Sequence, residues 1–94
     1  MIILCTENKK DFTKKDKEKL DDICQKLINF EIYNNNGKES GIEAIRREQI
    51  LLDIISLLSD IYLTRCGTYV YNMVFKGKFY FLDILTEKVT DRKI

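Results

Sequence analysis

The side chains that could do chemistry in this chain are three cysteines, an arginine pair and scattered carboxylates, with no histidine among its 94 residues. Without histidine the chain lacks the commonest general base, the Ser-His-Asp and Cys-His arrangements, and imidazole metal ligands. Cys5, Cys24 and Cys66 lie 19 and 42 positions apart, so they form no Cys-x-x-Cys motif, and zinc would lack a fourth ligand. Cys5 and Cys24 fall on apolar faces, where we expect burial. We therefore expect no catalytic residue, no bound metal and no cofactor.

Arg46 and Arg47 form the second group with chemical potential, because neighbouring guanidinium groups can bind phosphate or an acidic protein partner. The alternative, which we favour, is pairing within the chain with Glu43 or Glu48. The whole chain carries 16 Lys and Arg against 15 Asp and Glu, a net charge of +1. A nucleic-acid arm needs uncompensated positive charge, which this composition does not supply.

The chain contains no run that approaches the roughly 18 apolar residues of a membrane span. Its apolar start, residues 1–5, is shorter than the apolar core of a secretory signal and is followed by an acidic residue. The sequence therefore predicts a soluble, cytoplasmic protein without a membrane partner.

Two helices are expected to position these groups. The first covers residues 14–30 behind Thr13 as N-cap, because apolar residues recur there at helical spacing. A capping box, Ser40 to Glu43, predicts the start of the second, which we expect to run to about Thr64, with Cys66 near its end. From Ile50 onward the apolar arc of this helix is wide, which is typical of a helix that contacts neighbours on two sides.

Three strands are expected beside the helices. Residues 2–6 are apolar on both faces, which favours a strand inside the sheet. Residues 68–75 and 78–86 alternate around a Lys76-Gly77 turn and predict an antiparallel hairpin. Residues 87–94 are polar and are expected to form a flexible tail. The sequence thus predicts one compact α+β domain over residues 1–94, of order β-α-α-β-β, with two helices packed on one face of a three-stranded sheet.

The two-residue turn fixes which hairpin residues share a face. One face carries Tyr69, Tyr71, Met73, Phe75, Tyr80, Leu82 and Ile84. The other carries Val70, Asn72, Val74, Phe79, Phe81, Asp83 and Leu85. Burying the Asp83 carboxylate without a partner would cost several kcal/mol, so we expect the first face against the helices and the second facing outward.

The outward face needs an explanation because it is largely apolar. Soluble monomers seldom expose a contiguous apolar patch beyond about 300–600 Å². One explanation is an interface, with a second copy or with another macromolecule, formed by the seven residues from Val70 to Leu85. The other is that the segment around residues 30–33, or the C-terminal tail, folds over the face.

The spare sheet face and the missing catalytic groups favour a non-enzymatic protein-binding module. We expect it to be homodimeric and to inhibit or regulate a macromolecular partner. The 13 isoleucines, 12 lysines and 6 asparagines are typical of AT-rich coding sequences. Small products of AT-rich mobile elements such as phages include inhibitors of host defence systems and immunity proteins, and this association suggests such a role.

Two other functions stay open. The order strand, helix, helix, hairpin is similar in outline to small ribosome-dependent ribonuclease toxins, a resemblance of topology that covers no motif. It would imply chemistry by Tyr, Lys and Arg side chains, although those toxins are usually more basic than this chain. A single-stranded nucleic-acid binder would stack bases on Phe79 and Phe81, with Lys76 and Lys78 supplying charge.

Overall fold

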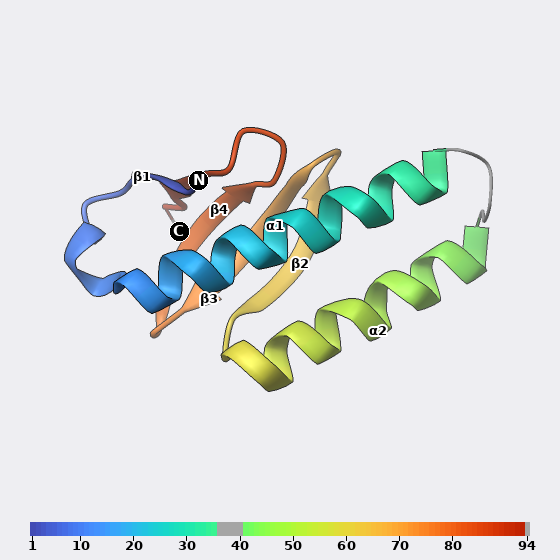
Figure 1. Ribbon diagram of the computed structural model, residues 1–94, viewed down its shortest axis with the longest axis horizontal. Helices are drawn as coiled ribbons and strands as arrows, with labels where there is room; N and C mark the ends of the chain where they lie inside the picture. Colours follow the sequence, from blue (N-terminus) through green and yellow to red (C-terminus); the bar gives the residue numbers. More distant parts are fainter. Residues whose placement is uncertain (36–40, 94) are drawn as a thin grey trace.

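The computed structural model of the chain describes residues 1–35 and 41–93. Along these residues the elements are β1 (Ile3–Cys5), a 3₁₀ turn (Lys9–Asp11), α1 (Lys14–Asn35), α2 (Gly41–Ser59), β2 (Tyr62–Gly67), β3 (Val70–Phe75), β4 (Lys78–Asp83) and β5 (Lys88–Asp91). Figure 1 shows both helices on the same side of the sheet, with α1 across its middle and α2 beside β2. The predicted α+β class is confirmed.

The sheet has five strands in the order β1-β5-β4-β3-β2, where the sequence predicts three. β1 runs parallel to β5, and the other neighbouring strands are antiparallel. β1 is therefore an edge strand and not the interior strand expected from its apolar residues. The number of helices and their place on one face of the sheet agree with the prediction, and the strand count does not.

The β3–β4 hairpin has the predicted register. Phe75 pairs with Lys78 beside the turn, and the ladder continues from there without a shift. Both turn residues have positive φ, 50° at Lys76 and 76° at Gly77, as a turn whose twist matches that of the strands requires. Alternation along this hairpin therefore places its residues on the faces that the sequence predicts.

The prediction that the second helix continues to Thr64 is wrong, because α2 ends at Ser59. Asp60 adopts a left-handed conformation, with φ 60°, which stops the helix and which aspartate tolerates better than most residues. After it, residues 61–63 alternate between buried and exposed as β2 pairs with β3. Cys66 accordingly lies in an exposed strand and not at a helix end.

The prediction of a flexible tail over residues 87–94 is wrong for Lys88–Asp91, which form β5. This strand lies between β4 and β1, and Val89 is completely buried between Leu82 and Leu4 in the ladder. The pairing joins the two ends of the chain, so no local pattern indicates it. Cys5, expected to be buried, is exposed because β1 is at the sheet edge.

The first helix is longer than predicted and ends at Asn35. Residues 30–33 are therefore helical and form neither a strand nor a lid. At its start the Thr13 hydroxyl accepts from the Asp16 amide at 3.2 Å, and the Asp16 carboxylate accepts from the Thr13 amide at 2.9 Å, which confirms Thr13 as N-cap. Ser40, the expected cap of the second helix, lies outside the described residues.

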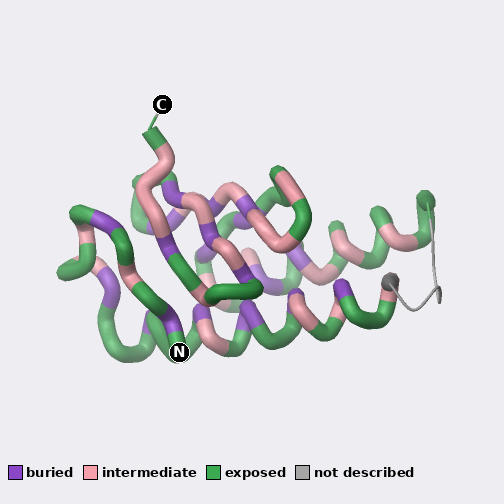
Figure 2. The backbone as a smooth tube through the Cα atoms, turned by 90° about the horizontal axis from the view of Figure 1, so that it is seen from above, coloured by how far each residue is buried: buried purple, intermediate pink, exposed green. Residues whose placement is uncertain are grey.

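The core lies between the helices and the inner face of the sheet. Its completely or almost completely buried side chains are Leu20, Cys24, Leu27, Ile61, Tyr71, Met73, Tyr80, Leu82, Ile84 and Val89. Figure 2 shows the alternation of buried and more exposed positions along the strands. One face of the sheet is thus covered by the helices, as predicted, and the other is left without a covering layer among the described residues.

Candidate binding surfaces

The uncovered side of the sheet holds the seven residues predicted to face outward. We call this set the outward sheet face: Val70, Asn72 and Val74 on β3, Phe79, Phe81 and Asp83 on β4, and Leu85 just after β4. Phe79 is 43% exposed and Leu85 is 63% exposed, while the central positions are half-buried by their neighbours in the sheet. Tyr62 on β2 and Ile3 on β1 extend the exposed apolar area toward the two sheet edges.

The two segments considered as covers for this face leave most of it uncovered. Residues 30–33 belong to α1, on the opposite side of the sheet, and residues 88–91 of the tail lie within the sheet. Arg92, which follows β5, shields the face in part, because its guanidinium lies 5.1 Å from the centre of the Phe79 ring. Asp83 accepts from the backbone amides of Leu85 and Thr86 at 3.0 and 3.1 Å, so its carboxylate is satisfied at the surface.

A second apolar surface lies on α2. Ile50, Ile54, Leu57 and Leu58, which we call the α2 stripe, are between 48 and 85% exposed. The helix contacts β2 and α1, as the width of its apolar arc predicts, and buries Leu52 and Ile55 there. Those two contacts leave the outer part of the arc facing solvent. The width of the apolar arc in the sequence indicates such a surface, but it does not show which residues of the arc stay exposed to solvent.

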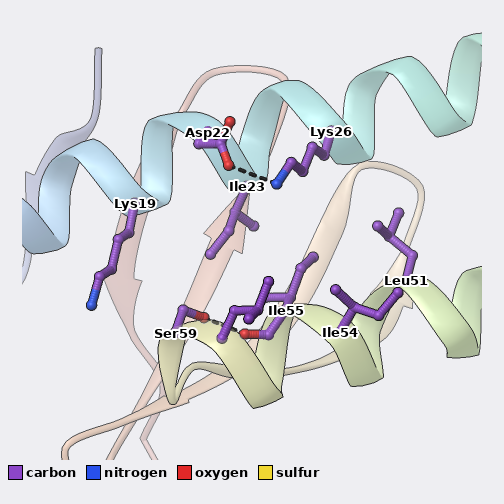
Figure 3. A pocket seen from close by; sticks show the side chains of 9 residues that line it. Lys19, Asp22, Ile23, Lys26, Leu51, Ile54, Ile55 and Ser59 are labelled. Atoms are coloured by element: carbon purple, nitrogen blue, oxygen red, sulfur yellow. Dashed lines mark hydrogen bonds and ion pairs between the residues drawn. The ribbon is translucent and has the colours of Figure 1, made fainter.

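A groove runs between α1 and the α2 stripe. Figure 3 shows Ile23 of α1 pointing toward Ile55 of α2 at its floor, with Ile54 on the α2 wall. Along the α1 rim, Lys26 pairs with Asp22 at 2.9 Å across one helical turn. The groove is thus apolar inside and charged along its α1 side.

The predicted arginine pair lines a second pocket, which adjoins this groove at Ile54. Arg46 and Arg47 border the second pocket near the start of α2, together with Ile50 and Tyr33. In Figure 1 this end of the helix pair extends beyond the sheet. The structure therefore places the arginine pair beside the α2 stripe and apart from the outward sheet face.

Glu48, considered as a partner of the arginine pair, binds Arg65. The Arg65 guanidinium donates to Glu48 Oε2 from Nε at 2.7 Å and from Nη2 at 2.5 Å, and it also pairs with Glu31 of α1. Nη2 donates to the Tyr71 hydroxyl oxygen at 3.0 Å. Burial, reinforced by the Glu48 carboxylate, raises the pKa of Tyr71 to about 12. Sequence reasoning misses this cluster because its members come from four separate elements.

The buried or half-buried carboxylates of this cluster and the buried thiol of Cys24 have structural roles. Arg65 binds both Glu31 and Glu48, the two carboxylates that it brings together. Burial raises the pKa of the Cys24 thiol to about 12, so it stays protonated at neutral pH. Within residues 1–35 and 41–93, no three Cys, Asp or Glu side chains form a group that could hold a metal ion.

Comparison with protein-family models, with curated proteins and with solved structures finds no match to this chain. Neither described helix is long and apolar enough to cross a membrane. The two apolar surfaces and the arginine pair are therefore the features from which a function can be inferred.

Proposed function

We propose that this chain is a non-enzymatic, cytoplasmic protein-binding module that works as a homodimer and inhibits or regulates a macromolecular partner by covering one of its surfaces. The observation that carries the proposal is the presence of two apolar surfaces on opposite sides of one small fold, the α2 stripe and the outward sheet face. Surfaces of this kind mark interaction sites. Because they face away from each other, both can be occupied at once.

The outward sheet face is assigned to the target protein. Phe79, Phe81 and the two valines of β3 supply an apolar centre, and Asn72 and Asp83 supply polar groups beside it. An apolar centre with polar groups around it is the usual anatomy of a protein–protein interface, with aromatic anchors carrying most of the binding energy. The occupant that fits is a flat apolar patch on another protein.

Binding is favoured over catalysis by the state of the reactive groups. The paired carboxylates are bound by Arg65, and the Cys24 thiol is held protonated by burial. The amino-acid composition, which is typical of AT-rich coding sequences, fits an inhibitor encoded by a mobile element. We include this origin in the proposal by association with such proteins.

The test begins with capture of a partner from cells of the native host and continues with that partner purified. The reconstituted complex should have a fixed stoichiometry, and Phe79→Ala should raise its dissociation constant at least about tenfold, as loss of an aromatic anchor does. Tyr33→Ala is the matched control, since Tyr33 is an aromatic residue of nearly equal exposure, 44% against 43%, on the helical side. Equal effects of the two variants would contradict the assignment of the face.

The same variants test the nucleic-acid alternative. A labelled single-stranded oligonucleotide is titrated with the wild type and with Phe79→Ala. If its affinity for the wild type falls as the salt concentration rises, and its affinity for Phe79→Ala is lower still, nucleic-acid binding would replace protein binding as the proposed function. Growth arrest on expression that is abolished by changing Arg46 and Arg47 together would instead favour the ribonuclease alternative.

A further inference from the structure

The α2 stripe has the spacing of a helix–helix seam. Ile50, Ile54, Leu57 and Leu58 recur at intervals of three and four residues along one side of α2. All four remain at least 48% exposed although their helix is packed on its other side. The stripe therefore offers a second helix a continuous apolar surface.

A row of charged residues flanks the stripe. Arg46 and Asp53 lie seven residues apart on one flank of α2, and Asp60 follows seven residues later, just past the end of the helix. The Arg46 end of this row borders a pocket that α1 also lines. Asp53 and Asp60 lie beside Leu57 and Tyr62 and not beside the α1 rim of the groove. This flank is positive near the start of α2 and negative near its end.

We propose that a second copy of this chain docks on the α2 stripe, with the two α2 helices packed antiparallel across a two-fold axis near residue 53. The inference rests on the homodimer of the proposed function and assigns it a surface. A two-fold interface must be self-complementary. In an antiparallel pair the two flanking rows lie side by side in opposite order, so Arg46 of each copy lies opposite Asp60 of the other.

The alternative helix orientation is less favourable. A parallel pair would place the charged row of one copy beside the flank of the other that carries Leu51 and Leu58, and it would align the two helix dipoles. The antiparallel pair has one unfavourable element, because the two Asp53 carboxylates meet near the axis. This repulsion gives the arrangement a signature that a generic hydrophobic contact would not have.

Docking at the stripe leaves the opposite side of the molecule free. The stripe belongs to the helical layer, and the outward sheet face lies on the other side of the sheet. A dimer of this kind would therefore present two target-binding faces, one from each copy. A variant can therefore lose dimerisation and keep target binding, or lose target binding and keep dimerisation.

Sedimentation equilibrium of the full chain tests the docking. The wild type should fit a monomer–dimer equilibrium, and Leu57→Glu should raise the dissociation constant about 30-fold or more, since it places a charge in the seam. Leu57 is 85% exposed, so the monomer should fold unchanged, which circular dichroism checks. Leu85→Glu is the same substitution at an exposed leucine of the outward sheet face and should leave the dissociation constant unchanged.

Charge variants test the antiparallel order. Arg46→Glu and Asp60→Lys should each weaken the dimer about 3- to 10-fold, and the double variant should recover most of the loss. Asp53→Asn should strengthen it, because it removes the repulsion at the axis. A monomeric wild type, a dimer broken by Leu85→Glu and not by Leu57→Glu, or a double variant without recovery would overturn the inference. None of these outcomes decides whether the outward sheet face binds a target.

Discussion

The guanidinium of Arg65, on the edge strand β2, donates from both Nε and Nη2 to a single carboxylate oxygen of Glu48 on α2. The same guanidinium pairs with Glu31 of α1, so one side chain ties the edge of the sheet to both helices. Its contact with α2 lies on the side of that helix opposite the stripe. The ion-pair cluster therefore helps to fix the orientation in which α2 presents its apolar residues to solvent.

Replacing Arg65 by methionine should destabilise the fold by about 2 kcal/mol in urea unfolding at neutral pH. The reason is that Glu31 and Glu48, with side chains only 10 and 16% exposed, would both lose their cationic partner. Lys26→Met is the control, because it removes an exposed pair with Asp22 and should cost less than about 0.5 kcal/mol. Similar losses in the two variants would show that the Arg65 cluster has no special structural role.

Val89→Ala should destabilise the protein by about 1–3 kcal/mol, since it opens a cavity at a completely buried position of β5. Val74→Ala, the same change on the outward sheet face, should cost less than about 1 kcal/mol. Chemical denaturation at a fixed protein concentration measures both. If Val89→Ala were no more costly than Val74→Ala, β5 would not be part of the folded sheet in solution.

Asp16→Asn should destabilise the protein by about 0.5–1 kcal/mol at pH 7 and by progressively less in acid. Burial alone would raise the pKa of Asp16, but hydrogen bonds from Thr13 and Lys76 outweigh it and hold the pKa below 3.8. A carboxyl with a depressed folded-state pKa adds stability above its unfolded pKa and loses it as the pH falls through the folded value.

Unfolding free energies of wild type and Asp16→Asn between pH 7 and pH 2 measure this dependence. The two curves should stay apart above about pH 4 and converge below it. A gap that is constant over the whole range would mean that the charge of Asp16 does not contribute.

Only two of the three thiols should react with a thiol reagent in the native protein. Cys5 and Cys66 are exposed, whereas Cys24 is buried and its pKa is raised to about 12. At pH 8 its reactive thiolate is therefore rare, so Cys24 should react only after denaturant is added. Cys24→Ala should abolish the additional reaction seen in denaturant, and three thiols reacting at one rate in the native protein would contradict the described core.

The parts of the fold that the sequence predicts correctly are those set by neighbouring residues. The β3–β4 hairpin follows from its two-residue turn and its alternation, and the inner stripe of α1 follows from helical spacing. The residues of the outward sheet face follow from the register of the hairpin, and Asp83 decides which of the two faces is outside. In the structure the Asp83 carboxylate accepts from the amides of residues 85 and 86, which agrees with that choice.

The parts that the sequence does not predict depend on distant segments. β5 is a strand between β4 and β1, which comes from the other end of the chain, and the residues of β5 alone resemble a polar tail. β2 directly continues an apolar helix, and only the conformation of Asp60 separates the two. Arg65 directly follows Thr64, the expected end of the second helix, and nothing local to it indicates that it is the centre of the ion-pair cluster.

The molar mass of the wild type in solution tests the account most directly, because every proposal begins from apolar surface that one copy leaves uncovered. Light scattering on the full chain at increasing concentration should show the mass rise toward twice the 11.1 kDa of a single copy. A mass that stays at 11.1 kDa at the highest concentration, with the α2 stripe intact, would contradict the homodimer and the role given to α2.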